Sequence, residues 1–142
     1  MENGIFSLEG KFSSKEKLGG IGIVQDSYSI PAGAHPNKSP YQEHLVTYHG
    51  PYHGGGTVSC KGKTVSGNIA IPGNSTVRAE YDSEKGTLIY FVNSVQQPVY
   101  ITGIKEKILL WDDIGSSFTD ISLKKLSTPT SGHVANEQAV QW

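Results

Sequence analysis

The sequence contains a single cysteine, Cys60, among its 142 residues, so no disulfide can form within the chain. No segment near Met1 combines basic residues with an apolar run of signal-peptide length. Both absences are typical of proteins in a reducing compartment. We therefore expect a cytoplasmic location.

Long apolar runs and an excess of one charge are also absent. The longest unbroken apolar runs are a few residues, as at 108–111, whereas a helix needs roughly 20 to cross a bilayer. The 12 basic and 13 acidic residues give a net charge of -1, which supplies no field to hold a phosphate backbone or an anionic membrane. We expect no nucleic acid and no membrane among the partners.

No complete catalytic signature is present. The sequence lacks the Gly-x-Ser-x-Gly elbow of a serine hydrolase, and Cys60 is more simply read as a small buried hydrophobe than as a reactive thiol. The Gly-Lys-Thr at 62–64 lacks the glycine that a phosphate-binding loop requires at position 57. We predict that the protein is not an enzyme and has no catalytic residues and no cofactor.

Three histidines, His44, His49 and His53, together with His35 and Glu43, suggest a metal cluster. Zinc needs three or four convergent ligands. If residues 43–49 form a strand, the first two of these histidines point to opposite faces. We therefore predict ordinary surface or loop histidines and no metal site.

What the sequence does contain is the composition of a globular, turn-rich protein, with 17 glycines and 7 prolines. Helical periodicity over ten or more residues is missing except in the last dozen positions. The length is sufficient for one core that needs no crosslinks.

The clearest pattern is a hairpin formed by residues 77–81 and 87–92. In the first arm Val77, Ala79 and Tyr81 alternate with charged residues, which predicts one face in a core and one in water. The second arm is apolar or β-branched throughout, which favours a strand covered on both faces. The joining loop begins with Asp82 and ends with Gly86, as tight hairpin loops often do.

Short strands are predicted along most of the remaining chain. Their expected positions are residues 5–12, 18–24, 43–48, 57–60, 65–71, 98–101, 107–111 and 118–123. Gly10 interrupts the first where a bulge would fit, and we expect the first two strands to pair.

This many short strands predicts an all-β fold, an antiparallel β-sandwich or jelly roll of two sheets, over residues 1–126. Residues 127–142 remain as a C-terminal tail, with docking of this tail on the sandwich as one alternative. Within it, residues 134–140 could form a turn or two of helix, with Trp142 packing back.

The hairpin at 81–93, Tyr-Asp-Ser-Glu-Lys-Gly-Thr-Leu-Ile-Tyr-Phe-Val-Asn, resembles the late hairpin of SPRY domains. Those domains show an aspartate, a short polar loop, Gly-Thr-Leu and an aromatic pair. Residues 4–12, 20–24 and 98–104 are similar to further SPRY segments in the same order. The resemblance implies a bent, concanavalin A-like sandwich that acts as a protein-interaction module, without shared catalytic residues. It also implies a peptide or protein partner held by loops at one end.

Two loops, at residues 25–42 and 50–56, carry aromatic side chains. Tyrosine gives rigid contact area and a hydroxyl, which suits a binding surface. The residues predicted to bind a partner are Asp26, Tyr28, Tyr41, Tyr52 and His53. The predicted function is a non-enzymatic module for a protein or short peptide partner. The alternative is a carbohydrate-binding, lectin-like module, because aromatic rings also stack on sugar faces.

Overall fold

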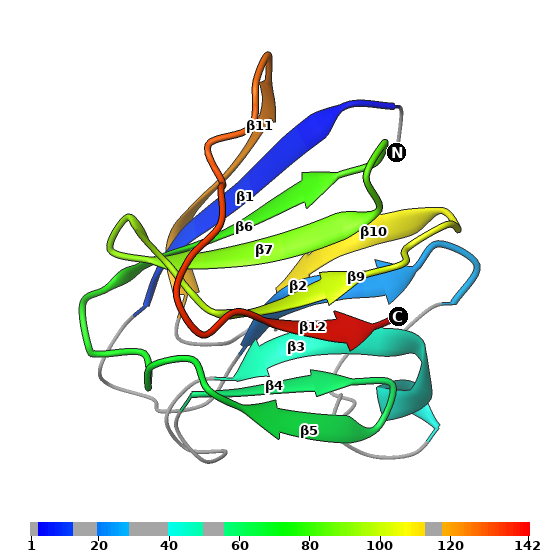
Figure 1. Cartoon of the computed structure of the whole chain (residues 1–142), viewed down its shortest axis with the longest axis horizontal. Helices are drawn as coiled ribbons and strands as arrows, with labels where there is room; N and C mark the ends of the chain where they lie inside the picture. The colour runs from blue at the N-terminus through cyan, green and yellow to red at the C-terminus, as the bar shows by residue number, and fades with distance from the viewer. Residues whose placement is uncertain (1–2, 13–19, 29–39, 50–55, 113–117) are drawn as a thin grey trace.

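The computed structural model describes residues 3–12, 20–28, 40–49, 56–112 and 118–142. These residues form two β-sheets packed face to face and one short 3₁₀-helix, η1 (Tyr41–His44) (Figure 1). The predicted all-β sandwich is therefore confirmed.

Sheet A holds seven of the described strands in the order β11-β1-β6-β7-β9-β12, with β8 paired to β7. Their bounds are β1 (Ile5–Phe12), β6 (Thr76–Asp82), β7 (Thr87–Val92), β8 (Val95–Gln96), β9 (Val99–Thr102), β11 (Phe118–Leu126) and β12 (Gln138–Gln141).

Sheet B holds five of the described strands in the order β10-β2-β3-β4-β5. Their bounds are β2 (Gly20–Gln25), β3 (Leu45–His49), β4 (Thr57–Cys60), β5 (Lys63–Ser66) and β10 (Ile108–Asp112). Among the described pairings, all are antiparallel except that of β12 with β9.

The core lies between the two sheets, where alternate residues of each strand point inward. Tyr48 of sheet B and Tyr90 of sheet A meet edge to face at its centre, with ring centroids 5.1 Å apart. Such aromatic contacts add to the stabilisation from buried apolar area. Cys60 is buried in this core, as predicted.

The predicted hairpin is β6 and β7, and its loop has the expected chemistry. The Asp82 carboxylate accepts hydrogen bonds from the backbone N–H groups of Glu84 and Lys85, at 3.0 and 3.1 Å. Gly86 has a φ of +66°, in the left-handed region. The loop therefore forms for the reasons that its sequence suggests.

The same hairpin contains one wrong prediction. Its charged face was expected in water, yet Glu80 is buried, at 2% relative exposure. The reason is that residues of the C-terminal segment cover the outer face of sheet A at this point. Ile89 of β7 lines a hollow together with residues of the same segment, so the segment also lies over part of the outer face of β7, which was predicted to be covered on both faces.

The prediction that the first two strands pair is wrong. β1 lies in sheet A between β11 and β6, and β2 lies in sheet B between β10 and β3. Neighbouring strands in sequence often pair, but here the chain changes sheets between them. The bulge predicted at Gly10 is confirmed by a register shift between Glu9 and Lys11.

The glycines of β2 are required by close strand packing. A Cβ on Gly22 would lie 1.8 Å from the carbonyl oxygen of Val46 on β3, and one on Gly20 would lie 2.1 Å from the Thr47 side chain. Any larger residue at position 22 would therefore push the backbones of β2 and β3 apart.

Residues 67–71 were predicted as strand but leave the ladder after β5 ends at Ser66. Their polar groups bond to sheet A instead. The Asn68 side chain accepts from the Val99 N–H at 2.8 Å, and the Ile69 N–H donates to the Gln97 side chain at 2.9 Å. Side-chain hydrogen bonds have replaced a ladder here, which an apolar pattern does not reveal.

Two further boundaries differ from prediction. Residues 43 and 44, expected in a strand, belong to η1. The helix expected at 134–140 is wrong, because the chain there ends in β12, which pairs with the open edge of β9. Trp142 does pack back against the core, as predicted.

In the described part of the chain, no helix is long and apolar enough to cross a membrane.

Candidate functional site

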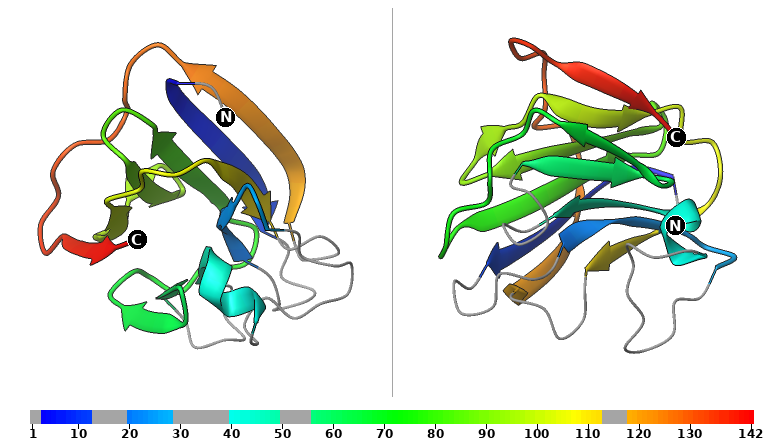
Figure 2. Two further views of the ribbon diagram at one scale, coloured as in Figure 1. Left: turned by 90° about the vertical axis from the view of Figure 1, so that its right-hand side faces the viewer. Right: turned by 90° about the horizontal axis from the view of Figure 1, so that it is seen from below.

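Several connections meet at one end of the sandwich, on the right in Figure 1 and facing the viewer on the left of Figure 2. They are the turn after β2, η1, the turn between β4 and β5, the connection from β9 to β10, and the C-terminus. Loops on a rigid β scaffold are where binding residues concentrate. This end is therefore the first place to look for a site.

Three aromatic side chains gather there. The Tyr28 ring stacks on the His44 ring, with centroids 3.9 Å apart and planes inclined by 15°. The Tyr41 ring lies 6.3 Å from that of Tyr28, tilted by 59°. All three side chains are half-buried, so each is fixed by packing and still presents surface.

Local structure explains this gathering. The Tyr28 N–H donates to the Gln25 carbonyl at 3.0 Å, which closes a turn directly after β2. In η1, which begins after Pro40, Tyr41 and His44 are three residues apart. A 3₁₀-helix has three residues per turn, so these two side chains lie on the same side.

A chain of polar contacts ties the aromatic group to the C-terminus. The His44 Nδ1 lies 2.7 Å from the Gln25 side-chain oxygen, and the Gln25 amide donates to Glu106 at 3.2 Å. The indole N–H of Trp142 donates to the same Glu106 oxygen at 2.5 Å. We call Tyr28, Tyr41, His44 and Trp142 the aromatic rim.

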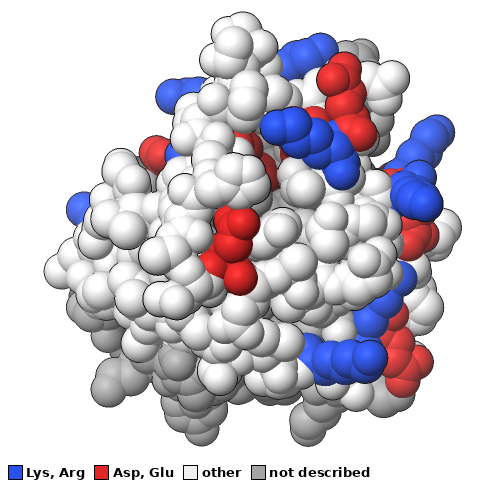
Figure 3. Space-filling model, in the orientation of Figure 1, with Lys and Arg blue, Asp and Glu red and all other residues white. Residues whose placement is uncertain are grey.

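One cation completes this arrangement. The Lys61 ammonium lies 3.7 Å from the Glu106 carboxylate and 4.2 Å from the centroid of the Trp142 ring. A cation over an indole is attracted by the ring quadrupole. Around the rim both signs of charge are interspersed, as the right-hand edge of Figure 3 shows. The described residues on this edge therefore carry charges of both signs.

The residues predicted to bind a partner divide into three groups. Tyr28 and Tyr41 come together in the rim. Asp26 is exposed beside it, and its backbone N–H donates to the Lys107 carbonyl at 3.1 Å. Tyr52 and His53 lie outside the described residues.

Sequence reasoning missed three members of this site. His44 was predicted to be an ordinary histidine rather than a metal ligand, although the sequence Pro-Tyr-x-x-His at 40–44 could have indicated a short turn with both rings on one side. Glu106 and Trp142 arrive from distant parts of the chain. No local pattern predicts their contact.

A polar pocket of about 190 Å³ lies on the other side of η1, over the outer face of sheet B. Its lining residues are Gln42, Leu45, His49, Thr57, Ser59, Gly62 and Thr64. The His49 Nε2 is 2.7 Å from the Ser59 hydroxyl, which is 3.3 Å from the Thr64 hydroxyl. Hydroxyl, amide and imidazole groups thus share one small hollow.

The structure separates the histidines that suggested a metal. His44 stacks on Tyr28, His49 bonds to Ser59, and His35 and His53 are outside the described residues. Within the described ranges, no group of three His, Cys, Asp or Glu side chains is placed to hold an ion. Burial raises the pKa of the Cys60 thiol, although Lys61 and Lys63 act in the opposite direction.

In comparisons with known proteins, the chain matches no family model and no curated protein.

Proposed function

We propose that the chain is a non-enzymatic binding module of SPRY type that holds a peptide or protein segment across the aromatic rim. The observation that carries this proposal is the stacking of Tyr28 on His44 beside Tyr41, at the end where the loops meet. Rigid, half-buried aromatic rings lose little conformational entropy on binding. The SPRY resemblance supports the same reading, because it implies a partner held by loops at one end.

The rim suits a peptide in its polar groups as well as in its rings. Tyrosine hydroxyls and the exposed Asp26 provide donors and acceptors around the apolar faces of Tyr28 and Tyr41. The near-neutral charge of the chain gives no reason to expect a strongly charged partner. We expect a partner segment with at least one apolar or aromatic side chain to lie against the rings.

A peptide-display selection tests this proposal. The bait proteins are the native chain, a rim variant with Tyr28→Ala and Tyr41→Ala, and a control with Tyr100→Ala. Tyr100 is a half-buried tyrosine on β9 that is not a member of the rim. We expect one motif to be enriched by the native chain and the control and lost with the rim variant.

Each alternative outcome has a definite meaning. Loss of enrichment with Tyr100→Ala alone would place the site elsewhere. Enrichment of no motif by the folded native chain would contradict peptide binding. Thermal melts of all three proteins establish that a lost motif does not reflect a lost fold.

The polar pocket favours a second candidate, a carbohydrate-binding module. Its hydroxyls and amide match the groups of a sugar, and the rim on the other side of η1 offers aromatic faces. A glycan array followed by sugar-dependent thermal shift tests it, with Ser59→Ala and Thr64→Val as pocket variants. A shift that both variants remove would favour this candidate over the peptide.

A cytoplasmic location remains a prediction of the sequence, and it is compatible with either partner.

A further inference from the structure

The C-terminal segment crosses the outside of sheet A from one edge to the other. It leaves β11 at one edge and joins β9 as β12 at the opposite edge. Figure 2, left, shows it passing around the outside of the sandwich. We call residues 127–137 the strap.

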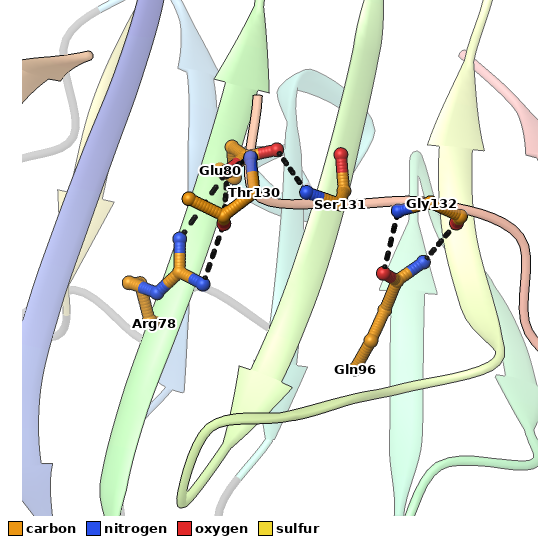
Figure 4. A network of polar contacts seen from close by, with 6 residues as sticks. All are labelled: Arg78, Glu80, Gln96, Thr130, Ser131 and Gly132. Atoms are coloured by element: carbon orange, nitrogen blue, oxygen red, sulfur yellow. Dashed lines mark hydrogen bonds and ion pairs between the residues drawn. The ribbon is translucent and has the colours of Figure 1, made fainter. Parts of the chain in front are cut away.

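The strap is held first by a buried carboxylate. The Glu80 side chain is 1% exposed, and its Oε1 accepts from the Thr130 hydroxyl at 2.6 Å and the Thr130 N–H at 3.0 Å. Its Oε2 accepts from the Ser131 N–H at 3.3 Å. Arg78 donates to both Glu80 and the Thr130 hydroxyl, at 3.3 and 2.8 Å (Figure 4).

The next contact is a reciprocal pair. The Gln96 side chain accepts from the Gly132 N–H at 2.9 Å and donates to the Gly132 carbonyl at 2.6 Å (Figure 4). Beyond it, β12 pairs in parallel with β9, and the Gln138 N–H donates to the Pro98 carbonyl at 2.7 Å. Most of these hydrogen bonds are made to the backbone of an extended chain, as they are when a peptide adds a strand to the edge of a sheet.

The surface that receives the strap belongs to other elements. Glu80 lies on β6, Gln96 on β8, and β9 supplies the edge. The strap itself buries little, because most of residues 127–137 are exposed. A hollow of about 180 Å³ lined by Ile89, Tyr100 and His133, among others, remains between the strap and the sheet. The receiving surface therefore offers more contact than the strap uses.

We propose that the outer face of sheet A, from Glu80 to Gln96 and the edge of β9, is a binding site for an extended peptide. Its occupant in one chain is that chain's own strap and β12. In trans, its ligand is the same segment of a second copy. Linkage within one chain gives the strap a high effective concentration, on the order of millimolar for short linkers. Exchange between copies is then seen only when the internal strap is weakened.

Two full-length variants test the exchange. The acceptor carries Thr130→Val and Gly132→Pro, which remove a hydroxyl and an N–H from the strap and leave Glu80 and Gln96 intact. The donor carries Glu80→Gln and Gln96→Leu, which impair the receiving surface and leave the strap intact. We expect each to be a monomer alone and the mixture to form a one-to-one dimer by native mass spectrometry.

A labelled peptide of residues 127–142 gives a second measurement. We expect the acceptor to bind this peptide at least ten times more tightly than the native chain does. Adding Gln96→Leu to the acceptor should remove that gain in affinity. A peptide with the two acceptor substitutions is the matched control. The contacts described for Tyr28 are with Tyr41, His44 and Gln25, none of which belongs to this site, so Tyr28→Ala in the acceptor should leave the gain in affinity unchanged.

Some results would overturn the proposal. A folded acceptor that binds no peptide, or a gain that survives both Glu80→Gln and Gln96→Leu, would show that the strap is only structural. A peptide gain without a mixed dimer would exclude a second copy as the ligand. Circular dichroism of each variant shows whether the fold is intact, and Gln96→Leu alone serves as the donor if Glu80→Gln unfolds the chain.

Discussion

Replacing Glu80 with glutamine tests the physical account of the strap. The substitution keeps the shape of the side chain and removes its charge. In the native chain three hydrogen bonds from Thr130 and Ser131, together with Arg78, converge on the carboxylate. In the variant one oxygen becomes an amide donor that faces these donors. The free energy of unfolding should therefore fall.

The size of the effect follows from the contacts. Hydrogen bonds to a charged group contribute about 1.5–3 kcal/mol each, against about 0.5–1.5 kcal/mol for neutral pairs. Losing that difference over three bonds, with part recovered by rearrangement, gives an expected destabilisation of about 2–3 kcal/mol at neutral pH. The Arg78 side chain is 17% exposed, so it can regain water when its partner is lost.

The difference in the free energy of unfolding between the native chain and the Glu80→Gln variant should also depend on pH. Burial raises the pKa of Glu80, but hydrogen bonds from Ser131 and Thr130 and the charge of Arg78 outweigh it, so the pKa lies below its ordinary 4.5. A carboxyl group with a lowered folded-state pKa stabilises fully above its unfolded pKa, and this contribution disappears as pH falls through the folded pKa. The difference in the free energy of unfolding between the native chain and the variant should therefore become smaller below about pH 5.

Urea unfolding followed by tryptophan fluorescence at several pH values between 7 and 3 measures this gap. Glu84→Gln is the matched control, since Glu84 is exposed in the β6–β7 loop, and we expect less than about 0.5 kcal/mol from it. An equal effect of the two substitutions at pH 7 would refute the role given to Glu80. A gap that stays constant down to pH 3 would refute the charge argument.

Two matched pairs test the core. Tyr48→Phe should lower the free energy of unfolding by about 1 kcal/mol, because the Tyr48 hydroxyl donates to a backbone carbonyl. Tyr90→Phe should be neutral or stabilising, because the buried Tyr90 hydroxyl has no partner in the described structure. Urea midpoints of both variants measure this, and a larger loss of stability for Tyr90→Phe would contradict it. Gly22→Ala should cost about 3 kcal/mol or more from overpacking, whereas Gly132→Ala, whose added methyl meets nothing within 4 Å, should be near neutral. Equal melting temperatures for the two alanine variants would show that β2 and β3 separate freely.

The sequence predicts well where the physics is local. The β6–β7 hairpin was predicted because a period of two, an aspartate that bonds two residues on and a glycine at positive φ all lie within 16 residues. The burial of Glu80 was not predicted, because it depends on Thr130, which lies 50 positions away in a polar segment without periodicity. A charged residue on a strand gives no sign of what covers it.

The candidate site divides in the same way. Tyr28 and Tyr41 could be proposed because aromatic residues in turn-rich segments suit a binding surface. Their link to Glu106 could not, because Gln25 and Glu106 are 81 positions apart and their contact requires both sheets to be assembled. Trp142 reaches the site only because β12 pairs with β9, where the sequence favoured a short helix.

Trp142 is a member of the aromatic rim and is also the residue that follows the docked β12, so it couples the two proposed sites. It follows β12 directly, and its indole donates to Glu106, which also accepts from the Gln25 amide beside His44. If β12 left sheet A, the rim would lose Trp142 and Glu106 would lose a donor. A partner that contacts Trp142 at the rim therefore favours the docked tail, and by reciprocity a docked tail favours that partner. The variants that expose the outer face of sheet A should bind a rim partner less tightly, even though the two sites share no other residue.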